Sequence, residues 1–178
     1  MVAAARHIDP DGRFALAAPR GPISLRTSGA RAWMLPRRRR PEQFGQSLLL
    51  LDAFVAEQCR AFGIGRERVV LGGFSQGASV ALGLAALRGR PVPAGVISWC
   101  GLVPGGFDVD LDLGRLEGVP VLCLFASDDE MISIDRTRAS ADQLRRVGAV
   151  VSSREYPGRH EISDEMLDDT REWLADIR

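Results

Sequence analysis

The stretch "RVVLGGFSQGASVALGLAAL", residues 68–87, decides the fold. An apolar run rich in Val and Leu ends in two glycines, Ser75 follows among small residues, and a second apolar run begins. Residues 68–73 read as a buried strand and residues 76–88 as a helix. Gly73-Phe74-Ser75-Gln76-Gly77 matches the pattern G-x-S-x-G, in which a serine occupies a sharp strand-to-helix turn. This context favours a nucleophilic serine over an incidental one.

The spacing of this motif has a physical reason. The backbone of a serine at such a turn is strained, and glycines two residues to either side let neighbouring segments approach closely. The side chain of Ser75 is then lifted clear of the sheet. The backbone N–H of Gln76, at the helix N-terminus, is placed to donate to a developing oxyanion.

A serine hydroxyl needs a base to take its proton, and the sequence contains two histidines. We expect His7, in a short polar segment, to be an exposed surface residue. His160 lies in "YPGRHEIS", just after the last predicted strand and at the edge of the sheet where ligands bind. Its place after Ser75 fits the chain order of hydrolases of this type, which is Ser, then Asp or Glu, then His.

The acid that orients the base is expected between the two, in "FASDDEMIS" at the end of a predicted strand. Asp128, Asp129 and Glu130 are the candidates. Spacing alone does not choose among them, and carboxylates at strand ends are often only surface residues.

Strands alternate with helices along the chain, which predicts an α/β fold with a mostly parallel sheet of about five strands and helices on both faces. With no internal repeat or linker, we expect residues 1–178 to form a single domain. The predicted strands are 13–19, 68–73, 94–99, 119–126 and 149–156, and the predicted helices are 44–62 (ended by Gly63), 76–88, 134–147 and 163–177.

The composition excludes several classes of function. Lys and Arg total 23 and so do Asp and Glu, so no global field favours nucleic acid or an anionic membrane. The three cysteines lack metal-site spacing and are expected to be buried free thiols, so we expect no metal. The longest apolar stretch is too short to span a bilayer, and the first residues do not resemble a signal peptide. We expect a cytoplasmic protein.

Together these motifs resemble the small carboxylesterase, phospholipase and acyl-protein thioesterase branch of the α/β-hydrolases. "LGGFSQGASVAL" looks like the nucleophile turn of that family, "APRGPI…SGARAW" resembles the segment leading to its pocket tryptophan, and "YPGRHEIS" is similar to its histidine loop. The resemblance implies a serine hydrolase that cleaves small-molecule carboxylic esters or thioesters through an acyl-serine intermediate, with no metal or cofactor. Ser75 and His160 would be the nucleophile and the base.

The acid block of the family usually reads H-G-x-x-D-x-V-V-P. Laid on "FASDDEMIS", this pattern places the acid at Asp129, with the pair Met131-Ile132 in the apolar positions. Phe125 and Ala126 stand where the family has His-Gly.

The chain departs from the family at its start. Members open with a strand that ends in a His-Gly-x-Gly loop, whereas "MVAAARHIDPDG" resembles the end of the helix that follows this loop. We therefore expect a chain that is incomplete at the N-terminus, with Gln76 as the remaining oxyanion donor. The missing strand would leave either a strand-wide gap between residues 13–19 and 68–73, or those two strands drawn together.

Other features carry weaker expectations. Trp33, Met34 and Leu35 would line the acyl site or be plain core contacts, and Cys100 is expected to be packing. The run "PRRRRP" (36–41) would attract an anionic leaving group or be solvated surface.

Two rival functions remain. A dienelactone hydrolase usually has cysteine at the turn, so Ser75 counts against that reading. A non-catalytic α/β domain that binds a ligand or partner is the other. The sequence does not decide between a monomer and a homodimer.

Overall fold

The computed structural model describes residues 2–25, 29–35, 41–105 and 109–177. Its centre is a four-stranded parallel sheet in the order β3-β4-β5-β6. These strands are Val70–Phe74, Gly95–Trp99, Pro120–Ala126 and Val150–Tyr156. Four of the predicted strands are thereby confirmed to within two residues at each end.

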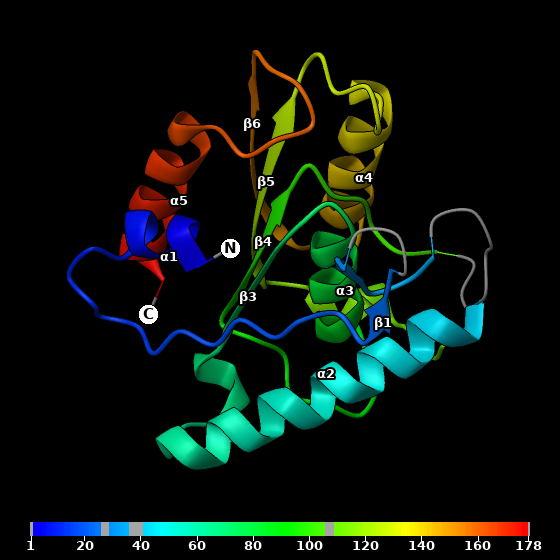
Figure 1. The fold of residues 1–178 in the computed structure, drawn as a ribbon, viewed down its shortest axis with the longest axis vertical. Helices are drawn as coiled ribbons and strands as arrows, with labels where there is room; N and C mark the ends of the chain where they lie inside the picture. The colour runs from blue at the N-terminus through cyan, green and yellow to red at the C-terminus, as the bar shows by residue number, and fades with distance from the viewer. Residues whose placement is uncertain (1, 26–28, 36–40, 106–108, 178) are drawn as a thin grey trace.

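Helices cover both faces of the sheet (Figure 1). Helices α1 and α5 lie on one side of it, and α3 and α4 lie on the other. The helices are α1 (Val2–Ile8), α2 (Pro41–Phe62), α3 (Gln76–Ala85), α4 (Ile134–Arg146) and α5 (Asp164–Asp176), with short 3₁₀ turns η1 (Arg66–Arg68) and η2 (Leu113–Leu116). The predicted α/β architecture is confirmed, although α3 ends at Ala85 rather than at residue 88.

The alternation of side chains along each strand builds two apolar layers. Val96 and Val121 pack with Leu144 in a cluster that includes residues of α3 and α4. Their neighbours Ile97 and Leu122 face the other way, into a cluster that includes residues of α5. Because both faces are buried, the strands read as continuous apolar runs in the sequence.

Helix α2 packs against the outer side of α3. Phe44 and Leu48 are fully buried there and share a cluster with Val80 and Leu84 of α3. Gly63 follows the last helical residue with φ of +64°, so the expected C-terminal glycine is confirmed. This packing holds α3 in place through the middle and C-terminal half of the helix.

The predicted strand at residues 13–19 is wrong. These residues form no strand, and within the described part of the chain β3 is an edge of the sheet, so neither expected arrangement beside it is seen. The backbone N–H groups of Arg13 and Phe14 donate instead to the Asp9 carboxylate. Since a strand needs a ladder partner, the short apolar run alone did not produce one. A two-stranded antiparallel sheet, β1 (Ile23–Ser24) with β2 (Arg31–Ala32), lies further along the chain.

Smaller expectations can also be set beside the structure. His7 is half-buried rather than exposed, because α1 packs on α5 and His7 Nε2 lies 2.9 Å from Asp168 Oδ1. All three cysteines are free and buried, as predicted. Residues 36–40 of the arginine run lie outside the described residues. None of the helices in the described ranges combines the length and the apolar character that a membrane span requires.

Candidate active site

Ser75 sits at the strained turn between β3 and α3. Its φ of 54° and ψ of −114° fall in a region that non-glycine residues rarely adopt. Ser75 occupies the N-cap position of α3, yet its side chain makes no capping hydrogen bond. The backbone N–H instead donates to the carbonyl oxygen of Trp99 at 2.9 Å, which ties the turn to β4. The hydroxyl is therefore left available for another partner.

The two glycines of the motif are not equivalent. A Cβ added to Gly73 would lie 2.2 Å from the carbonyl carbon of Gly77, so only glycine fits where β3 meets the first turn of α3. A Cβ added to Gly77 would meet nothing among the described residues closer than Trp33 Nε1, at 4.0 Å. The expectation that both glycines serve a close approach is correct for Gly73 and wrong for Gly77.

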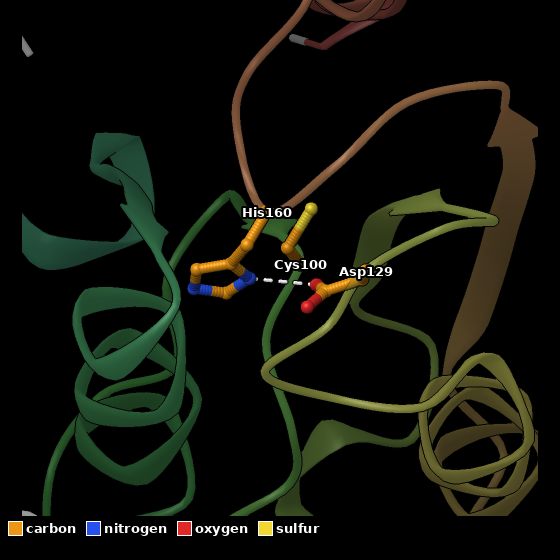
Figure 2. A group of neighbouring side chains, drawn as sticks. All are labelled: Cys100, Asp129 and His160. Atoms are coloured by element: carbon orange, nitrogen blue, oxygen red, sulfur yellow. Dashed lines mark hydrogen bonds and ion pairs between the residues drawn. The ribbon is translucent and has the colours of Figure 1, made fainter.

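A chain of two hydrogen bonds joins Ser75, His160 and Asp129. His160 Nε2 lies 2.9 Å from Ser75 Oγ, and His160 Nδ1 lies 2.6 Å from Asp129 Oδ2 (Figure 2 shows the second contact). An ionised carboxylate only accepts hydrogen bonds, so Nδ1 carries the proton and Nε2 is free to accept from the hydroxyl. This is the order of contacts that lets a histidine act as the base of a serine.

Asp129 is held as a carboxylate. Its side chain is 1% exposed, and this burial by itself raises the pKa of the group. Hydrogen bonds from the His160 ring and from the backbone N–H groups of Ile132 and Met131 outweigh the burial, so the pKa of Asp129 lies below its ordinary value. The two backbone donors, each 2.8 Å from Oδ1, also fix the orientation of the carboxylate.

The two neighbouring acids hold the histidine loop rather than the histidine ring. Asp128 Oδ2 accepts from the backbone N–H of Gly158 at 3.4 Å. Glu130 pairs with Arg159 at 2.9 Å and accepts from the backbone N–H of His160 at 3.4 Å. Of the three candidate acids, the structure therefore brings Asp129 to the imidazole.

Sequence reasoning missed two neighbours of the histidine. The ring of Phe74 packs against the ring of His160 with 4.7 Å between centroids. Cys100, which follows β4 with a φ of +47°, lies fully buried beside Asp129 and His160 (Figure 2). Its burial agrees with the predicted packing role, and that burial raises the pKa of the thiol to about 11. The sequence signal for both residues is that each directly follows a predicted strand. Parallel strands end at the same edge of the sheet, so residues at their ends lie close together.

The side chain of Gln76 holds the segment that contains Trp33 against the turn at Ser75. Gln76 Oε1 accepts from the backbone N–H groups of Trp33 at 3.3 Å and Met34 at 3.4 Å. The carbonyl oxygen of Trp33 accepts from Ser47 Oγ, and the N–H of Leu35 donates to Gln43 of α2. Trp33 and Met34 also pack against the α2–α3 cluster. Core packing and placement next to Ser75 thus coincide in these residues.

The backbone N–H of Gln76 directly follows Ser75 in the first turn of α3. N–H groups of a first helical turn have no acceptor within their own helix and attract negative charge. The position suits an oxyanion donor, and it is the one such donor that we identify among the described residues.

Known proteins of related sequence are similar to this chain over much of its length. The acyl-protein thioesterase 1 of Gibberella zeae is 33% identical over 116 residues, which is 63% of this chain and 49% of that protein. The acyl-protein thioesterase 1 of Candida albicans is 26% identical over 140 residues, 75% of this chain and 60% of that protein. The chain thus spans 49% and 60% of the lengths of these two relatives.

Solved structures share the fold. A carboxylesterase from Mesorhizobium loti superposes with a TM-score of 0.83 at 25% identity, covering 98% of this chain and 81% of that one. A Bacillus cereus carboxylesterase gives the same TM-score at 18% identity, covering 99% and 81%. The pattern that defines the phospholipase/carboxylesterase family matches residues 32–177. The chain therefore belongs to the phospholipase/carboxylesterase family and has the α/β-hydrolase fold.

Proposed function

We propose that this protein is a serine hydrolase that cleaves carboxylic esters or thioesters through an acyl-serine intermediate. Ser75 is the nucleophile, His160 the general base and then acid, and Asp129 the acid that orients the histidine. The single observation that carries the proposal is the pair of hydrogen bonds that links Ser75 Oγ to His160 and His160 to Asp129.

In the acylation step, Ser75 Oγ attacks the carbonyl carbon of the substrate while its proton passes to His160 Nε2. The resulting imidazolium is stabilised by the carboxylate of Asp129, which stays ionised. The oxyanion of the tetrahedral intermediate accepts from the N–H of Gln76. When the C–O or C–S bond breaks, the Nε2 proton moves to the leaving alcohol or thiol, and acyl-Ser75 remains.

Deacylation repeats these steps with water. His160 Nε2 takes a proton from the water as its oxygen attacks the acyl carbon, and returns the proton to Ser75 Oγ when the ester bond breaks. The carboxylic acid is released and the free serine is restored. The ring of Phe74 against His160 supports the same ring position in both halves of the cycle.

The substrate class follows from the relatives and from the site. The matched relatives are named as acyl-protein thioesterases and the solved structures as carboxylesterases, so esters and thioesters both belong in the test. Gln76 holds Trp33 next to Ser75 through a hydrogen bond. Trp33 would therefore contact the acyl group, together with Met34 and Leu35. The substrate is a small molecule, and no cofactor takes part.

The alternative is a non-catalytic domain that keeps the fold and binds a ligand or partner. The observation in its favour is that one oxyanion donor is identified among the described residues, where hydrolases of this fold use two. Loss of one such donor typically lowers turnover by ~10²–10³-fold. A slow enzyme and an inactive domain must therefore be distinguished by experiment.

The test is labelling of the protein with a fluorophosphonate probe, together with hydrolysis of a short p-nitrophenyl ester and of an acyl thioester. Wild type is expected to be labelled and Ser75→Ala to lose both labelling and hydrolysis, by up to roughly 10⁶-fold in turnover. Ser79→Ala is the matched control, because Ser79 lies in the same helix and its hydroxyl donates to the carbonyl oxygen of Leu102. Equal labelling of Ser75→Ala and wild type would overturn the proposal.

A further inference from the structure

Cys100 has no part in the reaction proposed above, yet its sulfur lies beside the two residues that support Ser75. One ligand atom from each of Cys100, Asp129 and His160 lies within 4.8 Å of the other two. The three residues come from different places: the end of β4, the loop after β5 and the loop after β6 (Figure 2). This meeting of a thiol, a carboxylate and an imidazole is a chemical feature separate from the proposed reaction.

These three groups are ligand types that zinc takes in proteins. Three protein ligands leave a fourth tetrahedral position for water. A divalent ion with one thiolate, one carboxylate and one neutral imidazole has no net charge, which suits a buried position. A tetrahedral ion with bonds of 2.0–2.3 Å needs ligand atoms roughly 3.3–3.7 Å apart, so a shift of about 1 Å would complete the site.

We propose that Zn²⁺, or a similar thiol-binding divalent ion such as Cd²⁺, binds Cys100 Sγ, a carboxylate oxygen of Asp129 and His160 Nδ1, and that this binding inhibits the hydrolase. The inhibition rests on the function proposed above, whereas the binding does not. His160 Nδ1 is the ligand because it faces Asp129, while Nε2 faces Ser75.

The placement of protons explains the inhibition. Binding releases the Cys100 thiol proton to solvent, and Nδ1 gives up its proton so that its lone pair can bind the ion. The ring stays neutral by carrying its one proton on Nε2 instead. Nε2–H then donates to Ser75 Oγ and has no lone pair to accept the serine proton. The base is lost although Ser75 and His160 remain in contact.

The burial of the site sets the rate of binding. Cys100 is 0% exposed, and its thiol contacts the carbonyl oxygen of Glu161 at 3.6 Å in the histidine loop. The His160 side chain is 14% exposed, which makes it the most exposed of the three ligand residues. An ion must therefore break the His160–Asp129 hydrogen bond before it reaches the sulfur. Because this step comes first, we expect inhibition to develop slowly.

The test uses Cd²⁺ as a spectroscopic probe and Zn²⁺ as the inhibitor, with purified, reduced protein. Cd²⁺ is expected to give an ultraviolet sulfur-to-metal charge-transfer band with wild type, and Zn²⁺ to inhibit ester hydrolysis after preincubation, reversibly with a chelator. Cys100→Ala is expected to keep its activity, lose the band and lose at least about 10- to 100-fold in Zn²⁺ sensitivity, because removal of a ligand costs no less than removal of a residue that only supports a ligand. Cys59→Ala is the matched control, since Cys59 is a buried thiol on α2, in the cluster between α2 and α3.

The outcomes separate the two proposals. The Cd²⁺ band is read without substrate, so it tests the metal site even in a protein that hydrolyses nothing. Absence of the band in wild type, or its persistence in Cys100→Ala, overturns the site. A Cys100-dependent band accompanied by full hydrolysis overturns the inhibition alone.

Discussion

The side-chain oxygen of Gln76 accepts a hydrogen bond from the backbone N–H of Trp33 at 3.3 Å, so the residue after Ser75 also holds the segment that contains Trp33. The same oxygen accepts from Met34 at 3.4 Å. Gln76 thus has two separable parts: a backbone N–H next to Ser75, and a side chain that positions Trp33. Substitution of Gln76 changes the side chain and leaves the backbone N–H in place.

Gln76→Ala is therefore expected to raise KM for long acyl chains more than it lowers kcat, because the oxyanion donor remains while the Trp33 segment loses its anchor. Loss of two neutral hydrogen bonds at about 1 kcal/mol each sets the scale, roughly a 5- to 30-fold effect. Steady-state kinetics across a series of p-nitrophenyl esters measures it. Gln76→Glu is the control, since a carboxylate also accepts both N–H groups. A fall confined to kcat with all chain lengths would show that the side chain does not position the acyl site.

Asp129→Asn and Asp128→Asn are expected to differ strongly. An asparagine at 129 favours the wrong histidine tautomer, and the corresponding change in a known triad lowers kcat by ~10⁴-fold. Asp128 contacts the backbone of Gly158 and the hydroxyl of Ser127, so Asp128→Asn is expected to stay within about tenfold of wild type. The ratio of kcat/KM values for the two variants is the measurement. A greater loss at 128 than at 129 would contradict the assignment of the acid.

The glycines of the motif provide a matched pair for stability. Gly73→Ala is expected to destabilise the fold by about 1–3 kcal/mol or more, because its Cβ would lie 2.2 Å from a backbone carbon of Gly77. Gly77→Ala is expected to be neutral or to stabilise by up to about 1 kcal/mol, because its Cβ has open space in the first turn of α3. Thermal and urea unfolding of the two variants decide this. Equal destabilisation by both substitutions would be inconsistent with the geometry of the turn.

The Arg138–Glu155 pair predicts a pH-dependent contribution to stability. Arg138 donates to both carboxylate oxygens of Glu155 at 2.7 Å, linking α4 to β6, and this contact holds the pKa of Glu155 below its ordinary value. A lowered pKa in the folded state stabilises the protein above the ordinary pKa of about 4.3, and the contribution is lost as the pH falls through the lowered value. Wild type is therefore expected to exceed Glu155→Gln in stability at pH 7, with the difference vanishing at acid pH. Unfolding curves of both proteins from pH 7 to pH 3 test this; a constant difference would rule out the ion pair as its cause.

Local sequence determined much of the framework. The runs that became β4 and β5 are continuously apolar because both faces of the sheet are buried, and the apolar positions of α2 recur at helical spacing because one face packs on α3. The turn at Ser75 could also be predicted, because G-x-S-x-G between a strand and a helix is a local pattern. Each of these features depends on residues close together in the chain.

Other features depended on contacts between distant segments, and the tertiary structure alone decided them. Residues 13–19 have the pattern of a strand, but a strand forms only where a neighbour completes its ladder. Spacing left Asp128, Asp129 and Glu130 as equals, and the family pattern favoured Asp129. The contact itself depends on which carboxylate the loop after β5 turns toward His160, 31 residues away, and only the folded chain shows that. The position of Cys100 beside the same pair has the same origin: parallel strands bring their ends together at one edge, while the loops that follow decide which side chains meet.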